Sequence, residues 1–90
     1  MNTRFIRRIV YPTPADTETL FYFLLEDTDP ARYGVRIMET SSSGTLLSQE
    51  AVPSVTSDRS VMMQILKLLI DGSVSPCTLH DVIEDLTAVG

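Results

Sequence analysis

The segment from Ser57 to Leu86 restricts the fold most, because it contains two consecutive helical patterns separated by a short turn. In the first pattern, polar residues recur at steps of four, three and four, so they form one narrow stripe on a helix. This stripe consists of Ser60, Gln64, Lys67 and Asp71. The remaining surface of this helix is apolar. This apolar area covers more of the helix circumference than packing on one sheet face normally buries.

Local signals predict where the first helix begins and ends. We expect Ser57 to be its N-cap, with Asp58 in the first turn beside the positive end of the helix dipole. Gly72 follows the last periodic residue, and we expect it to adopt the left-handed conformation of a C-terminal cap.

The second helix has an ordinary amphipathic pattern with one apolar and one polar face. Its apolar residues are Leu79, Val82, Ile83 and Leu86. Its polar residues are His80, Asp81, Glu84 and Asp85. Two starts fit the sequence: Ser75 as a cap followed by Pro76, or Thr78 as a cap with Asp81 completing a capping box.

The first half of the chain is rich in strand-forming residues divided by turn residues. The expected strands are residues 4–11, 20–26, 33–38 and 45–52. Short connections favour an antiparallel meander, and the helices that follow must bury their apolar faces on the sheet. The sequence therefore predicts an α+β fold with a three- or four-stranded antiparallel sheet and two C-terminal helices packed on one face.

The length of 90 residues predicts one domain. Within it we expect three parts: an N-terminal strand and connection over 1–19, the antiparallel sheet over 20–55, and the helix pair over 56–90.

The strand from Leu20 to Leu25 is apolar on both sides, which is unusual for a sheet covered on one face. We expect either the first strand, its connection or a second subunit to cover the other face. The first helix also carries surplus apolar residues, and large exposed apolar patches usually mark interfaces. The sequence therefore predicts a homodimer with interface residues Phe21, Phe23, Met63 and Ile70.

Composition narrows the class of protein. The net charge of −5 disfavours general attraction to nucleic acid or anionic membrane, because both require Lys and Arg against phosphates. The single cysteine, Cys77, excludes an internal disulfide framework, and the longest apolar run, Leu20 to Leu25, is too short for a membrane helix. No phosphate-binding loop is present, since the glycines are isolated. We expect a cytoplasmic protein without a cofactor or membrane partner.

Four residues with metal-binding or catalytic side chains recur at i, i+3, i+4 and i+7, so they can share one side of the second helix. These residues are Cys77, His80, Asp81 and Glu84. Cys77, His80 and Glu84 are accordingly weak candidates for metal ligands, although zinc sites normally show paired Cys or His ligands. Cys77 and His80 can also be interpreted as a thiolate-imidazole pair. The interpretation that we favour is a solvated acidic helix face without a metal site or catalytic residues.

Arg59 stands at the start of the first helix, where positive charge is unfavourable by a few tenths of a kcal/mol. We expect a structural salt bridge, near Asp58 or with Glu39 or Glu50 of the sheet, in preference to a role in ligand binding. A helix-turn-helix reading is disfavoured, because the exposed face of the second helix is acidic and phosphates repel it.

Several short motifs together resemble a family of short uncharacterised bacterial proteins, a domain of unknown function from Gram-positive anaerobes. These motifs are Tyr22 to Asp27, Tyr33 to Val35, Ser57 to Arg59, Leu68 to Ile70, Val74 to Pro76 and Asp81 to Asp85. The likeness spans about Leu20 to Leu86, with the first nineteen residues as a less typical extension. The resemblance implies a cytoplasmic bacterial protein and supplies no functional residue.

The sequence thus predicts a small non-enzymatic protein-interaction or regulatory module that acts as a homodimer and can also bind an unknown protein partner. The alternative is a small metal-binding or nucleic-acid-binding regulator.

Overall fold

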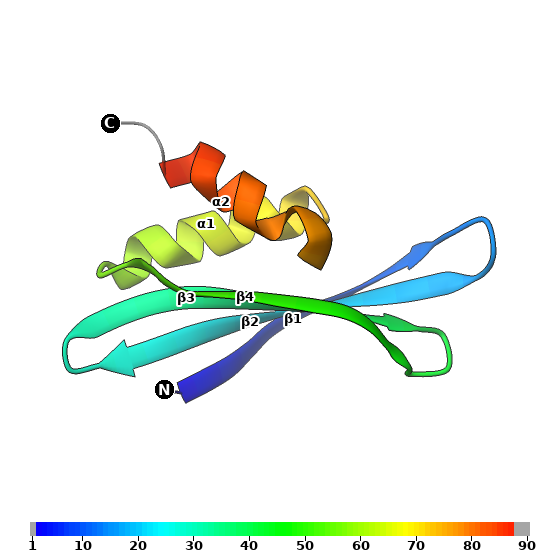
Figure 1. Cartoon of the computed structure of the whole chain (residues 1–90), viewed down its shortest axis with the longest axis horizontal. Coiled ribbons are helices and arrows are strands. Elements are labelled where there is room, and N and C mark those ends of the chain that lie inside the picture. The colour runs from blue at the N-terminus through cyan, green and yellow to red at the C-terminus, as the bar shows by residue number, and fades with distance from the viewer. Residues whose placement is uncertain (1, 88–90) are drawn as a thin grey trace.

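The computed structural model describes residues 2–87 and contains one antiparallel sheet followed by helices (Figure 1). The strands are β1 (Asn2–Pro12), β2 (Thr17–Thr28), β3 (Ala31–Ser41) and β4 (Leu46–Thr56). The helices are α1 (Arg59–Asp71) and α2 (Leu79–Thr87), and a short 3-10 helix, Pro76–Thr78, precedes α2. The strands form a meander in the order β1-β2-β3-β4, with both helices on one face. The predicted fold class is confirmed, with four strands.

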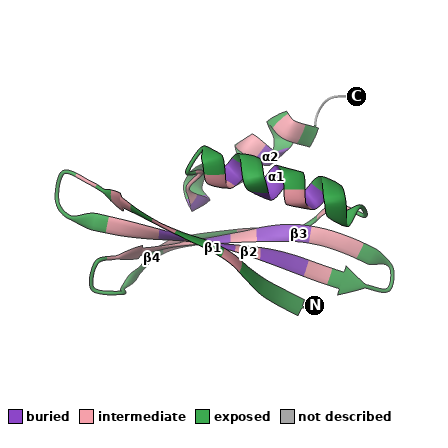
Figure 2. Ribbon diagram, turned by 180° about the vertical axis from the view of Figure 1, so that it is seen from behind, coloured by how far each residue is buried: buried purple, intermediate pink, exposed green. Residues whose placement is uncertain are grey.

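The core lies where the middle of β2 and β3 meets the helices (Figure 2). On the sheet side, its fully buried members are Leu20, Tyr22, Leu24, Val35 and Ile37. On the helix side they are Met62, Leu66, Leu69 and Leu79. Burying one such apolar side chain contributes about 1.5–3 kcal/mol, so this two-layer contact supplies most of the driving force for folding.

The strands extend beyond the predicted ranges, and β4 continues through Pro53 to Thr56. Proline is tolerated there because β4 is an edge strand and its pairing with β3 shifts register between Tyr33 and Val35. Gly34 lies opposite this irregularity, and a Cβ at that position would come within 2.2 Å of the Val52 carbonyl oxygen. Only glycine allows β4 to approach β3 this closely.

Helix α1 begins one residue later than expected. Asp58, and not Ser57, is the N-cap, and its Oδ1 accepts hydrogen bonds from the amides of Ser60 at 2.8 Å and Val61 at 3.3 Å. A carboxylate at this position satisfies two free amides and also offsets the helix dipole, which explains why Asp58 takes the cap.

The prediction that Gly72 is the left-handed C-terminal residue is wrong. Gly72 has a φ of −88°, and Ser73 adopts the left-handed conformation with a φ of 49°. The amide of Ser73 donates to the Ile70 carbonyl and the amide of Val74 to the Leu69 carbonyl, each at 3.0 Å. These two bonds define a Schellman motif, which requires a left-handed residue one position beyond the cap.

Ser75 and Pro76 take the predicted order at the start of the 3-10 turn that precedes α2, but the Ser75 hydroxyl makes no capping hydrogen bond. Ser75 precedes the 3-10 helix and Pro76 is its first residue. The Thr78 hydroxyl donates to the Ser75 carbonyl at 3.3 Å, so Thr78 belongs to this first turn. The 3-10 turn places Cys77 before the α-helical spacing of α2 begins.

We expect Ser73→Gly to stabilise the protein. A left-handed conformation is unfavourable for a residue with a Cβ, so its relief should raise the free energy of unfolding by about 0.5–1 kcal/mol despite the greater chain entropy of glycine. Gly72→Ala is the matched control. Gly72 has an ordinary helical φ, so this substitution changes the neighbouring residue without relieving any left-handed strain. Urea titration measures both variants, and a destabilised Ser73→Gly protein would contradict the assignment.

We expect Tyr22→Phe to lower stability and flatten its alkaline pH dependence. The Tyr22 hydroxyl donates to the Val74 carbonyl at 2.9 Å, and losing this bond should cost about 1–2 kcal/mol at pH 7. Burial, with Glu39 nearby, raises the pKa of Tyr22 to about 12. Because the folded-state pKa exceeds the ordinary value, the associated stability is present below pH 10 and is lost between pH 10 and about 12.

Urea titrations at several pH values from 7 to 12 measure this effect. The free energy of unfolding should fall less steeply above pH 10 in the variant than in the wild type. Equal slopes would show that Tyr22 is not held protonated by the fold.

Candidate functional site

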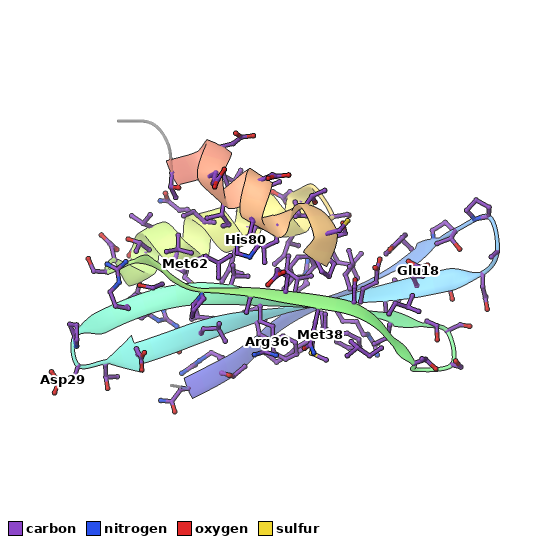
Figure 3. The ribbon with its side chains drawn as sticks, viewed as in Figure 1. Glu18, Asp29, Arg36, Met38, Met62 and His80 are labelled. Atoms are coloured by element: carbon purple, nitrogen blue, oxygen red, sulfur yellow. The ribbon has the colours of Figure 1, made fainter. Side chains whose placement is uncertain are left out.

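The face of the sheet opposite the helices carries a cluster of apolar side chains, Phe5, Phe21, Phe23 and Met38, which we call the sheet patch. Phe5 pairs with Phe23, and Phe21 with Met38, so the four residues share one face across β1, β2 and β3. The ring of Phe5 lies 6.3 Å from that of Phe21 and 5.7 Å from that of Phe23. Phe5 remains 54% exposed. Met38 points away from the helices (Figure 3).

Arginines accompany the sheet patch. Arg8 lies opposite Phe21 and Arg36 opposite Phe23 in the strand register, and Arg36 points to the same side as Met38 (Figure 3). Arg32 belongs to the same face and pairs in register with Asp27. The strand glutamates occupy the alternate positions, on the helix side: Glu18, Glu26, Glu39 and Glu50. Asp27 is the strand carboxylate on the uncovered face, and Arg4 and Arg7 lie on the helix side. The uncovered face therefore has an excess of arginines over strand carboxylates, and the helix side has an excess of strand carboxylates over arginines.

The first strand does not fold over the patch. β1 instead pairs with β2 along its whole length and lies in the plane of the sheet. The interpretation that β1 or its connection covers this face is therefore wrong for residues 2–87. On this side of β2, Phe21 and Phe23 are half-buried and Leu25 is buried.

A second apolar site lies on the helix side, between α1 and β1. The helices stand over β2, β3 and β4, which leaves the side of α1 nearest β1 open. The resulting depression, which we call the α1 groove, has a volume of about 300 Å³. Its lining residues are Ile6, Arg7, Met63, Leu66, Lys67, Ile70 and Asp71.

The structure separates the four predicted interface residues into two pairs. Phe21 and Phe23 belong to the sheet patch, and Met63 and Ile70 line the α1 groove on the other face. Sequence periodicity identified all four as surplus apolar residues. Periodicity did not show that the sheet lies between the two pairs. That arrangement depends on which face of the sheet the helices cover.

The candidate metal ligands on the second helix are dispersed. Nε2 of His80 lies 3.4 Å from Oε1 of Glu50 on β4, and Sγ of Cys77 lies 3.1 Å from the Ser75 hydroxyl. Glu84 is exposed. Within residues 2–87, no three His, Cys, Asp or Glu side chains gather closely enough to hold a metal ion. The structure does not bring Cys77, His80 and Glu84 together.

His80 instead connects α2 to the sheet, and its position between α2 and β4 is visible in Figure 3. The Ala51 amide and His80 both donate to Glu50 and lower the pKa of its carboxyl group. The pair is exposed to solvent, so this contact orients side chains and contributes little to stability.

Arg59 forms a salt bridge, but its partner is neither Glu39 nor Glu50. Nε of Arg59 lies 3.8 Å from Oε2 of Glu26, and the other oxygen of Glu26 accepts from Nε of Arg4 at 3.2 Å. Glu26 stands on the helix side at the end of β2 where α1 begins. Its partner could be assigned only once the strand register was known.

Sequence analysis missed a polar cluster at the opposite end of the sheet. The Tyr11 hydroxyl lies 2.6 Å from Oε2 of Glu18 and also hydrogen-bonds Oε2 of Glu39. Ser48 donates to the other oxygen of Glu39 at 3.1 Å. Burial, together with hydrogen bonds to both carboxylates, raises the pKa of Tyr11 far above its usual value. The phenol therefore remains a hydrogen-bond donor that ties β1 to β2 and β3.

The chain matches the sequence profile of a family of unknown function (DUF6514) over residues 3–89. This match includes most of the first nineteen residues, which the resemblance had treated as an extension. No curated protein and no solved structure matches the chain.

Within residues 2–87, none of the helices is both long enough and apolar enough to span a membrane.

We expect the reactivity of Cys77 to be independent of His80. The thiol is exposed and contacts Ser75, whereas His80 contacts Glu50. His80→Ala should leave the rate of Cys77 modification by a disulfide reagent at pH 7 within about twofold of wild type, because an isolated exposed thiol reacts according to its own thiolate fraction. A large decrease in that rate would instead show that the imidazole activates the thiol.

Proposed function

We propose that this chain, which belongs to the DUF6514 family of unknown function, is a small non-enzymatic protein-interaction or regulatory module that acts as a cytoplasmic homodimer. The observation that carries this proposal is the exposure of apolar residues on two separate surfaces, the sheet patch and α1. Phe5 on the sheet and Leu68 on α1 are each 54% exposed. Contiguous apolar surface of this kind usually marks a site of association.

The α1 surface is the better site for a second copy. In a two-fold symmetric dimer the same patch of both copies is in contact. The patch must therefore carry both positive and negative charges, so that each can face an opposite charge on the other copy. The α1 groove contains both signs, with Lys67 and Asp71 one helical turn apart and Arg7 beside them. Met63 and Ile70 in the same groove provide the apolar contact. Leu68 is exposed elsewhere on the outer surface of α1.

The sheet patch is less suited to pairing with itself. Arg8, Arg32 and Arg36 share its face, so a symmetric contact would bring like charges together. Like charges opposed in a desolvated interface are unfavourable by several kcal/mol. We therefore assign self-association to α1 and leave the sheet patch free for a different partner.

We expect the wild-type protein to be a dimer at micromolar concentration in size-exclusion chromatography with light scattering. Lys67→Glu should weaken the dimer by about tenfold, because it leaves Asp71 of the other copy opposite a negative charge. The double variant Lys67→Glu/Asp71→Lys should restore the dimer, since it exchanges the two charges.

Asp81→Lys serves as a control on α2, outside the groove, and should leave the dimer unchanged. A monomeric wild type would contradict the homodimer. If Lys67→Glu leaves the dimer unchanged, the contact between the copies does not involve the α1 groove.

A further inference from the structure

We infer that the uncovered sheet face binds an acidic, apolar segment of another protein, with the phenylalanines as apolar anchors and Arg8 and Arg36 as charge partners. This inference rests on the proposed function for the class of protein, an interaction module, and adds the chemistry of its partner. It uses a surface on the opposite side of the sheet from the α1 groove.

The first support is the charge of this face in an otherwise acidic protein. The chain has a net charge of −5, with 12 acidic residues against 7 basic ones. Nevertheless the uncovered face carries Arg8, Arg32 and Arg36 against one strand carboxylate, Asp27, whereas the strand glutamates lie on the helix side. Such separation creates a local positive potential that favours association with an acidic surface.

The second support is that Arg8 and Arg36 are not neutralised. On the helix side Arg4 and Arg59 both reach Glu26. In the described part of the chain, by contrast, no ion pair joins Arg8 or Arg36 to a carboxylate. Nη1 of Arg36 donates only to the Gln49 side chain, at 3.1 Å. Both guanidinium groups therefore retain donors that a carboxylate on a partner can accept.

The third support is the position of the arginines beside the aromatic residues. Arg8 is the register partner of Phe21 and Arg36 that of Phe23, so each charge adjoins an apolar side chain on the same face. Aromatic and arginine side chains together form the energetically dominant centre of many protein interfaces. A partner with alternating apolar and acidic side chains would satisfy both kinds of group at once.

Single-stranded nucleic acid fits this face less well. Bases stack on freely accessible ring faces. Here the ring of Phe5 is inclined at 54° to Phe21 and at 64° to Phe23, so the rings pack against one another.

The test measures fluorescence anisotropy with three 12-unit probes: a peptide alternating Glu and Leu, its Lys and Leu counterpart, and a single-stranded oligothymidylate. We expect the acidic peptide to bind at least about tenfold more tightly than either other probe, and less tightly as salt is raised. Arg8→Gln and Arg36→Gln should each weaken binding of the acidic peptide by about fivefold.

Matched controls separate this face from the rest of the protein. Arg7→Gln changes the neighbouring arginine, which lines the α1 groove, and should leave peptide binding within about twofold. Phe5→Ser should weaken binding, whereas Leu68→Ser, at equal exposure on α1, should not. Circular dichroism melts verify that each variant folds.

Equal or tighter binding of the basic peptide or the oligothymidylate would overturn the inference, as would equal losses for Arg7→Gln and Arg8→Gln. Absence of acidic-peptide binding with the dimer intact would overturn this inference and leave the proposed dimer standing. If the protein is a monomer and binds the acidic peptide, the proposed dimer is overturned and this inference stands.

Discussion

The structure depends on the contact between one side of β2 and β3 and the inner surface of α1. Leu20, Tyr22 and Leu24 alternate along β2 on the side that meets Met62, Leu66 and Leu69 of α1. Tyr22 is completely buried, and its hydroxyl reaches the Val74 carbonyl in the connection between the helices. This one contact selects which sheet face is covered. The opposite side of β2, with Phe21 and Phe23, is thereby left without a covering layer within the described chain.

Much of the fold could be predicted from local patterns, because helical and strand periodicity depend on neighbouring residues. The four strands in meander order and the two helices on one face follow from this information. The exact residues at the two ends of α1 were less predictable. Asp58 and Ser57 both suit an N-cap, and the left-handed position fell on Ser73, where glycine would be the usual residue.

The candidate sites could be predicted as residues but not as surfaces. The surplus of apolar residues at Phe21, Phe23, Met63 and Ile70 was visible in the sequence, but their separation onto opposite sides of the sheet was not. The partners of Arg59 and Tyr11 likewise depend on strand register, which brings Glu26 and Glu39 close from distant positions. The possible metal ligands had helical spacing in the sequence, but a 3-10 turn precedes α2 and His80 contacts β4.

The irregular edges of the sheet have a consequence for how far it can grow. An unpaired edge strand can template addition of further strands and lead to aggregation. On β4, Pro53 lacks an amide donor and the register shifts twice. On β1, a bulge between Phe5 and Arg7 interrupts the regular ladder, and three arginines place like charges along the strand. The same chain that exposes an apolar sheet face thus resists edge-to-edge pairing of its sheet with another copy, so association is directed to its faces.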